Sequence, residues 1–278
     1  MRTIAFDIGG TDVKYGIIDN GEMNTGSFPV ATANGEKALP YRICDFIKDN
    51  GADKVALCAP GPFDYKNGVS HAEHKLHELF EVELGKMVLD TGVKEAFFIH
   101  DAGAFLLGMI SQNDYAKKGS HCGITIGTGL GYMNSIDGKL FVNEKLAPRN
   151  SVWCLPWKDG ICENYVSATA ISNFAQKLGY TGKTVKEIGI LAENGDPVLA
   201  KMHEEMGEEL GNIMNMQQEI DGFETIFFGG NVVRSWCLFK EGFERVCKIP
   251  YKVTNAPGEA AIHGLLYACE QGADNLYV

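Results

Sequence analysis

Apolar positions along the chain form short runs of strand length that alternate with longer stretches of helical spacing. Runs at residues 4–8 and 13–18 flank a Gly-Gly-Thr turn, which predicts a β-hairpin at the start of the chain. A second hairpin of the same design, with Gly-Thr-Gly at its turn, is predicted around residues 123–133. Further strands are predicted at residues 54–58, 95–99 and 225–228, and helices at residues 36–50, 77–90, 102–110, 163–178, 197–219 and 259–268.

This mixture of strands and helices predicts an α/β fold with two lobes. The two glycine turns are roughly a hundred residues apart, and a device repeated at such a spacing suggests two related halves. A chain of 278 residues with 45% hydrophobic content is long and apolar enough for two cores. We predict an N-terminal lobe at residues 1–115, a C-terminal lobe at residues 116–258, and a C-terminal helix within residues 259–278 that packs on the first lobe.

The formal net charge of -11 argues against nucleic-acid binding, which needs lysines and arginines against phosphates. It does not argue against ATP, because local dipoles and a metal ion can hold a nucleotide. The sequence shows neither a basic leader with an apolar run nor a run of membrane-spanning length, so we expect a cytoplasmic protein that does not enter the membrane. Most of the eight cysteines, Cys237 among them, stand among apolar neighbours, which favours reduced, buried thiols over disulfides.

The two glycine turns have the composition of an anion-binding site. Gly9-Gly10-Thr11 and Gly127-Thr128-Gly129 let the backbone approach an anion closely, and their N–H groups and threonine hydroxyls can donate hydrogen bonds to it. Each motif alone is also an ordinary hairpin turn, and neither continues into the Gly-Lys-Ser/Thr of a Walker loop. Their recurrence favours a polyphosphate held by both turns.

Asp101 stands where the predicted strand at residues 95–99 gives way to a helix. A carboxylate at this position can be a helix N-cap, which is worth about 1 kcal/mol. Ligands of α/β sheets bind beyond the carboxyl ends of strands, so it can also be a catalytic carboxylate that accepts the proton of an attacking hydroxyl. Two other turns, Pro60-Gly61-Pro62 and Gly229-Gly230, are either plain backbone turns or places where a ligand meets the backbone.

Six motifs together carry a resemblance to a known family. In chain order they are Asp7-x-Gly9-Gly10-Thr11-x-x-Lys14-x-Gly16, Pro60-Gly61-Pro62-x-Asp64, Asp101-Ala-x-Ala, Gly127-Thr128-Gly129-x-Gly131, Gly229-Gly230-Asn231 and Gly258-Glu-Ala-Ala. Their order resembles that of the ROK family of sugar kinases and repressors, and the likeness covers nearly the whole chain. It implies two ribonuclease-H-like lobes of the actin-like ATPase type, with a nucleotide and sugar cleft between them.

The resemblance also implies a role for each matching residue. Asp101 would be the general base, and Asp7 would lie near Mg²⁺, with or without a water between them. ATP phosphates would be held by Asp7, Gly9, Gly10, Thr11, Lys14, Gly127, Thr128 and Gly129, the adenosine by Gly229, Gly230 and Asn231, and the sugar by Gly61, His74, His100 and Glu163.

Several positions depart from the family's pattern. His100 replaces an asparagine beside the base, and the cysteine-rich zinc motif is reduced to Cys154 and Cys162, too few ligands for a tetrahedral site, so we expect no structural zinc. Glu163 stays in register, either as a sugar contact or as a helix-start acid that favours the helix dipole. The loop with His71, His74 and His77 is open to interpretation as a sugar contact, a pH-sensitive rim, a metal site or plain surface.

The leading hypothesis is an ATP-dependent carbohydrate kinase, and the departures suggest a substrate other than plain glucose. The alternatives are a non-catalytic sugar or nucleotide sensor of the repressor branch and a degenerate kinase that binds a partner. Repressors of that branch carry an N-terminal helix-turn-helix domain, which we do not expect before Ile4. The methionine-rich helix at residues 197–219 is interpreted as core or as the face of a homodimer.

Overall fold

A computed structural model describes residues 2–33, 35–73 and 76–278, and the chain forms two compact units. The first unit takes the chain up to Lys118 together with Ser135–Arg149 and Glu259–Val278, and the second takes Gly119–Asn134 and Asn150–Gly258. The predicted lobe boundaries differ from this grouping at residues 116–118 and 135–149.

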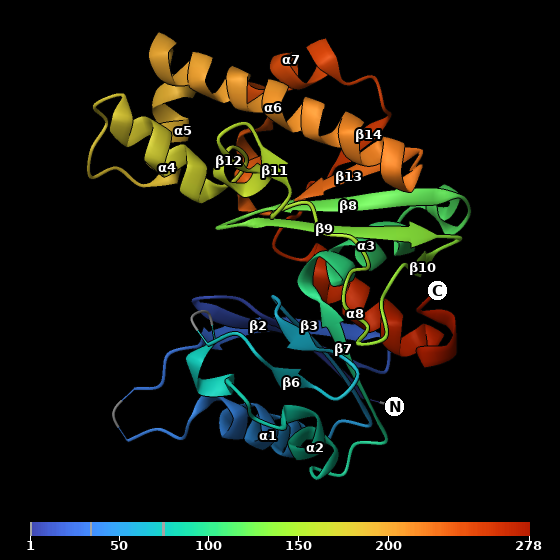
Figure 1. The fold of residues 1–278 in the computed structure, drawn as a ribbon. Coiled ribbons are helices and arrows are strands. Elements are labelled where there is room, and N and C mark those ends of the chain that lie inside the picture. Colours follow the sequence, from blue (N-terminus) through green and yellow to red (C-terminus); the bar gives the residue numbers. More distant parts are fainter. Residues whose placement is uncertain (1, 34, 74–75) are drawn as a thin grey trace. The chain divides into compact units, whose positions relative to one another are not determined.

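The first unit is a five-stranded sheet in the order β3-β2-β1-β4-β7, with helices on both faces (Figure 1). β1 pairs antiparallel with β2 and parallel with β4, which pairs parallel with β7, so the predicted N-terminal hairpin is confirmed. Its elements are β1 (Thr3–Ile8), β2 (Asp12–Asp19), β3 (Glu22–Pro29), α1 (Leu39–Asn50), β4 (Lys54–Ala59), β5 (Phe63–Asp64), β6 (Val69–Ser70), α2 (Leu84–Leu89), β7 (Glu95–His100), α3 (Asp101–Ser111), β10 (Lys139–Leu140) and α8 (Ala260–Gln271).

The helix predicted over residues 77–90 is wrong. A 3₁₀ turn at His77–Leu79 and the short helix α2 replace it. Between them Phe80 bridges to Ser70 in β6, and Glu81 has a positive φ of 56°, which a helix cannot contain. The Glu78 side chain binds outside this segment. Its carboxylate accepts the backbone N–H of Leu39 at 2.6 Å and so caps α1. Pairing with other parts of the first unit has overridden the local helical pattern.

Helices α3 and α8 cross at a point where each helix has a glycine, Gly108 in α3 and Gly264 in α8. A Cβ built on Gly108 would lie 1.9 Å from the carbonyl oxygen of Ala260, and one built on Gly264 would lie 1.8 Å from that of Ala104. The absence of side chains at both positions lets the two backbones meet directly. This contact joins the last helix of the chain to the helix that follows β7.

The second unit has a sheet in which β9, β8, β13 and β14 follow one another, with β10 paired to the end of β9. β8 and β9 are neighbours joined only by Gly127-Thr128-Gly129, which confirms the second predicted hairpin. The elements are β8 (Ser120–Ile126), β9 (Leu130–Ile136), β11 (Pro156–Trp157), β12 (Gly160–Ile161), α4 (Ala168–Lys177), α5 (Val185–Glu193), α6 (Pro197–Asp221), β13 (Thr225–Gly229), α7 (Trp236–Val246) and β14 (Tyr251–Val253).

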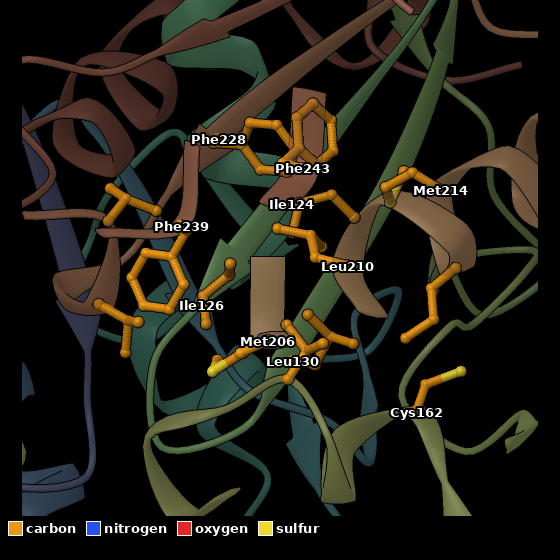
Figure 2. Close-up of a cluster of buried hydrophobic side chains, with 14 of the residues drawn as sticks. Ile124, Ile126, Leu130, Cys162, Met206, Leu210, Met214, Phe228, Phe239 and Phe243 are labelled. Atoms are coloured by element: carbon orange, nitrogen blue, oxygen red, sulfur yellow. The ribbon is translucent and has the colours of Figure 1, made fainter. Parts of the chain in front are cut away.

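The core of the second unit is built by α6, α7 and the sheet (Figure 2). Met206, Leu210 and Met214 of α6 are at most 4% exposed and pack in one cluster with Phe228 of β13 and Phe243 of α7. The methionine-rich face of α6 is therefore core, and it does not supply a free face for a second copy. A homodimer stays a prediction.

His203 is a titratable group buried in this helix. The residue is 1% exposed, its Nδ1 lies 2.7 Å from the carbonyl oxygen of Leu199, and its ring meets that of Phe239 edge-on. Burial lowers the pKa of His203 below its ordinary value. The unfolded chain therefore binds a proton here more readily than the folded protein, and His203 lowers stability as the pH falls through the unfolded value of 6.5.

We expect this pH dependence to be reduced in a His203→Leu variant. The unfolding free energy of the wild type should decrease between about pH 7.5 and 5.5, and that of the variant should decrease less, because leucine cannot take up a proton. Urea unfolding at both pH values measures the difference. Equal decreases in the two proteins would show that His203 does not contribute to the pH dependence.

All eight cysteines lie in the described part of the chain and are free. Six are buried, whereas Cys154 and Cys237 are exposed. The expectation that Cys237 is buried is therefore wrong, because α7 turns this residue toward Glu193 at the surface. Within the described residues, none of the helices combines the length and the apolar character that crossing a bilayer requires.

Candidate functional site

Three parallel strands of the first unit bring polar side chains to one edge of its sheet. Asp7 of β1 is in register with Cys58 of β4, and Ala59 of β4 is in register with His100, the last residue of β7. Asp101 follows directly as the first residue of α3. Because parallel strands end at the same edge, the predicted residues Asp7, His100 and Asp101 come together there, as is common for ligand sites of α/β sheets.

Asp7 lies among both attractive and repulsive charges. Burial raises its pKa, and the charge of Asp101 raises it further. Lys14, directly opposite on β2, and a hydrogen bond from the Cys58 thiol to Oδ1 at 3.3 Å lower the pKa. The two carboxylates are therefore close enough to interact, and the Lys14 charge partly compensates them.

Asp101 is half-exposed and is the first residue of α3. Its side chain is 38% exposed, and Oδ1 accepts the backbone N–H of Ala102 at 2.7 Å. Nδ1 of His100 lies 3.0 Å from the same oxygen and accepts the Ala102 N–H at 3.2 Å, which makes His100 the N-cap. The interpretation of Asp101 as the N-cap is thus wrong by one residue. The second carboxylate oxygen of Asp101 is left for another role.

Tyr65 and Cys58 belong to this site, although the sequence did not point to them. The Tyr65 hydroxyl donates to the carbonyl oxygen of Ala59 at 3.0 Å, and its ring lies edge-on to that of His100 at 5.8 Å. Burial raises the pKa of Tyr65, and the negative charge of Asp101 adds to the effect.

A Cβ on Gly61 would be 3.7 Å from the Tyr65 hydroxyl, an ordinary contact, so packing does not require a glycine there. The only signal for Cys58 was its place at the end of a buried strand.

The first glycine turn joins β1 to β2. Gly9 N–H donates to the carbonyl oxygen of Asp12 at 3.0 Å, which closes the turn, and a Cβ on Gly9 would approach that oxygen to 3.1 Å. A Cβ on Gly10 would meet nothing within 4 Å of the described chain. Gly10 and Thr11 are exposed. Packing explains the glycine at position 9 and leaves position 10 open to an approaching group.

The second glycine turn is fastened to the start of α4. The Gly127 N–H donates to the carbonyl oxygen of Gly129, and the Gly127 carbonyl accepts the N–H of Ala168 at 2.8 Å. The Thr169 hydroxyl donates to the carbonyl oxygen of Thr128, also at 2.8 Å. A Cβ on Gly127 would again meet nothing within 4 Å of the described chain.

The Glu163 carboxylate reaches this second turn. Its Oε2 accepts the backbone N–H of Leu130 at 2.9 Å, and a Cβ on Gly129 would lie only 2.3 Å from that oxygen. Helix α4 begins later, at Ala168, with Ser167 as its N-cap. The interpretation of Glu163 as an acid at the start of this helix is therefore wrong, and the contact with the turn was not anticipated.

Gly230, which follows the last residue of β13, Gly229, has a reason within the chain. Gly230 has a φ of 86°, and a Cβ there would lie 2.3 Å from the carbonyl oxygen of Ile126. The backbone therefore requires glycine at position 230, as the tight-turn interpretation proposed. Asn231 follows on the surface. Its predicted contact with adenosine stays a prediction.

Two of the three histidines in the histidine loop lie among the described residues. His74 lies outside the described residues, whereas His71 is exposed with its Nδ1 2.7 Å from Glu81, and His77 is exposed. Among the described residues, no three histidine, cysteine or acidic side chains come together as ligands. The absence of structural zinc remains a prediction, since zinc content is measured on the protein itself.

Known proteins are similar to this chain over most of its length. The sequence model of the ROK family matches residues 3–248. A β-glucoside kinase of Klebsiella pneumoniae is 24% identical over 249 residues, which covers 84% of this chain and 82% of that protein.

Solved structures extend the comparison to the fold. A ROK-family glucokinase of Streptomyces griseus, solved with glucose and AMPPNP, superposes with a TM-score of 0.79 at 21% identity and covers 98% of this chain and 100% of that one. A ROK-family transcriptional regulator, homologous to the MLC protein of E. coli, superposes with a TM-score of 0.76 at 15% identity over 96% of this chain and 78% of that one. The predicted actin-like α/β fold is confirmed.

Proposed function

Because the chain belongs to the ROK family, we propose that it is an ATP-dependent carbohydrate kinase with Asp101 as its general base. The observation that carries this proposal is the half-exposed Asp101 carboxylate at the sheet edge where β1, β4 and β7 end. One of its oxygens is held by the N–H of Ala102, so the side chain is oriented while the other oxygen is available. A carboxylate held in this way can accept the proton of a sugar hydroxyl as that hydroxyl attacks the γ-phosphoryl group.

The nucleotide would be held by backbone more than by charge. In the first unit, Gly10 and Thr11 would donate to phosphate oxygens beside Lys14, and in the second unit Thr128 and Gly129 would do the same. Gly9 and Gly127 would line the phosphate site and close the two turns with their own N–H groups. The open space beside Gly10 and Gly127 supports this proposal, since packing within the chain does not require glycine at either position. The adenosine would lie against Gly229, Gly230 and Asn231.

The acidic edge fits Mg²⁺ bound together with a nucleotide. Mg²⁺ prefers oxygen ligands and is usually held by one or two carboxylates together with waters and substrate phosphates. Asp7 would supply one such carboxylate, directly or through a water, and Asp101 lies close enough to Asp7 to raise its pKa. When bound, the ion would offset phosphate charge, and Lys14 would compensate the Asp7 charge beside it.

The sugar would be recognised by groups beside the base. His100 is 15% exposed next to Asp101, Gly61 leaves its backbone open, and Glu163 retains one oxygen, Oε1, that accepts no hydrogen bond within the described chain. His74 is included by the same resemblance. Because histidine stands at position 100, we propose a carbohydrate other than plain glucose.

A coupled ADP-release assay tests the function and the substrate together. The panel should contain glucose, other hexoses, amino sugars, β-glucosides and polyols. We expect ADP release that depends on one of these compounds and exceeds the rate on glucose. A glucose rate equal to the best hexose would overturn the substrate proposal. Nucleotide and sugar binding without any ADP release would favour the sensor alternative instead.

A further inference from the structure

The Glu163 carboxylate contacts the Gly127-Thr128-Gly129 turn where the turn enters β9. This contact suggests a role for Glu163 other than sugar binding. We propose that Glu163 is a positioning residue that holds the turn in the shape that binds nucleotide phosphate. The inference rests on the proposed kinase function. It concerns the affinity for nucleotide in the absence of any sugar, which a residue that only contacts sugar would not change.

The first argument is the bond itself. Leu130 is 3% exposed, so its N–H, the first after the turn, would be left without a partner if Glu163 were removed. A buried N–H without an acceptor is costly, and a hydrogen bond to a carboxylate is stronger than one to a neutral group. The bond therefore fixes the point at which the turn enters β9.

The second argument is the steric match between the turn and the carboxylate. Oε2 occupies space that a Cβ on Gly129 would enter, at 2.3 Å. Glycine at this position is thus explained by Glu163. Within the described chain, the N–H groups of Thr128 and Gly129 donate to no protein acceptor, so they stay available for an anion while Glu163 takes the N–H of Leu130.

The third argument is that Glu163 is itself held in place. Its N–H donates to the carbonyl oxygen of Trp153 at 3.1 Å, and its carbonyl oxygen accepts the Ser167 hydroxyl at 2.8 Å. Ser167 caps α4, and the next residue, Ala168, donates to the Gly127 carbonyl. The turn is therefore held on one side by the start of α4 and on the other by the Glu163 carboxylate.

Calorimetric titration with the non-hydrolysable analogue AMPPNP and Mg²⁺, without sugar, tests the proposal. We expect Glu163→Leu to weaken binding about tenfold or more, because the Leu130 N–H loses its acceptor. Glu163→Gln should stay within about threefold of the wild type, since the amide oxygen can accept the same bond. Glu163→Asp keeps the charge but shortens the reach, and it should resemble the leucine variant.

Asp159→Asn is the matched control. Asp159 lies four positions earlier, and its carboxylate accepts from the Tyr165 hydroxyl instead of the turn, so AMPPNP affinity should not change. Wild-type affinity in both Glu163→Leu and Glu163→Asp would overturn the inference while leaving the kinase proposal intact. Failure of the wild type to bind AMPPNP would overturn the kinase proposal and the inference with it. If Glu163→Leu does not fold, the aspartate and glutamine variants decide the question by themselves.

Discussion

Asp101→Asn is expected to lower kcat about 10²- to 10⁴-fold, the usual contribution of a general base. Asparagine has nearly the same shape, and its side-chain oxygen can still accept the Ala102 N–H that orients Asp101. The change therefore removes proton acceptance without removing the helix start. Nucleotide affinity should stay within about threefold of the wild type, because the glycine turns are untouched.

The control for this experiment is Asp114→Asn. Asp114 is an exposed acid of the same unit that pairs with Lys117, and its replacement should leave kcat unchanged. Steady-state kinetics on the best sugar of the panel, with thermal unfolding of each variant, supply the comparison. An Asp101→Asn enzyme that keeps more than about a tenth of the wild-type kcat would show that another group accepts the proton.

Gly264→Ala is expected to lower the unfolding free energy by about 2–3 kcal/mol, in the range of overpacking substitutions. The new Cβ would clash with the carbonyl oxygen of Ala104, which would lie only 1.8 Å away. Because this oxygen belongs to the backbone, it cannot move aside as the end of a side chain can. The gain in helix propensity from glycine to alanine, at most about 1 kcal/mol, opposes the effect without cancelling it.

Urea unfolding of Gly264→Ala measures this effect. Glu270→Ala, an exposed position on the same helix, should change stability by less than about 0.5 kcal/mol and serves as control. Gly108→Ala should have a similar effect to Gly264→Ala, and the double variant should lose less than the sum, because both strain the same crossing. Full stability of Gly264→Ala would mean that α3 and α8 can separate without loss.

Strands β1, β2, β4, β7, β8, β9 and β13 could be predicted from the sequence because they are short apolar runs next to glycine or proline turns. Helices were harder to predict. Helix α5 escaped prediction although its capping box of Thr184 and Glu187 was present in the sequence. The helix at residues 77–90 was predicted in error because Glu78 and Phe80 are engaged by distant parts of the first unit, which no local pattern reveals.

The site was only partly predictable for the same reason. The places of Asp7 and Asp101 follow from strand ends, which the sequence marks. The closeness of Cys58 to Asp7 depends on strand register, and the contact of Glu163 with Leu130 joins residues 33 apart in the chain. Neither could be derived from spacing.

Glycine motifs illustrate this limit most clearly. Gly129 and Gly230 carry similar sequence signals to Gly10 and Gly127. A Cβ on Gly230 would meet backbone and one on Gly129 would meet the Glu163 carboxylate, whereas a Cβ on Gly10 or Gly127 would meet nothing within 4 Å in the described part of the chain. Only the structure separates the glycines that have close neighbours in the fold from those that leave room for a ligand.

Transfer of the γ-phosphoryl group itself is the most direct test of the account. The protein should be incubated with ATP, Mg²⁺ and the best carbohydrate of the panel, and the γ-phosphate, phosphate-ester and inorganic phosphate signals should be followed by ³¹P NMR. We predict a new phosphate-ester signal on the sugar that grows in step with ADP and is lost with Asp101→Asn. Release of the γ-phosphoryl group only as inorganic phosphate, or no consumption of ATP with any carbohydrate, would contradict the assignment as a carbohydrate kinase.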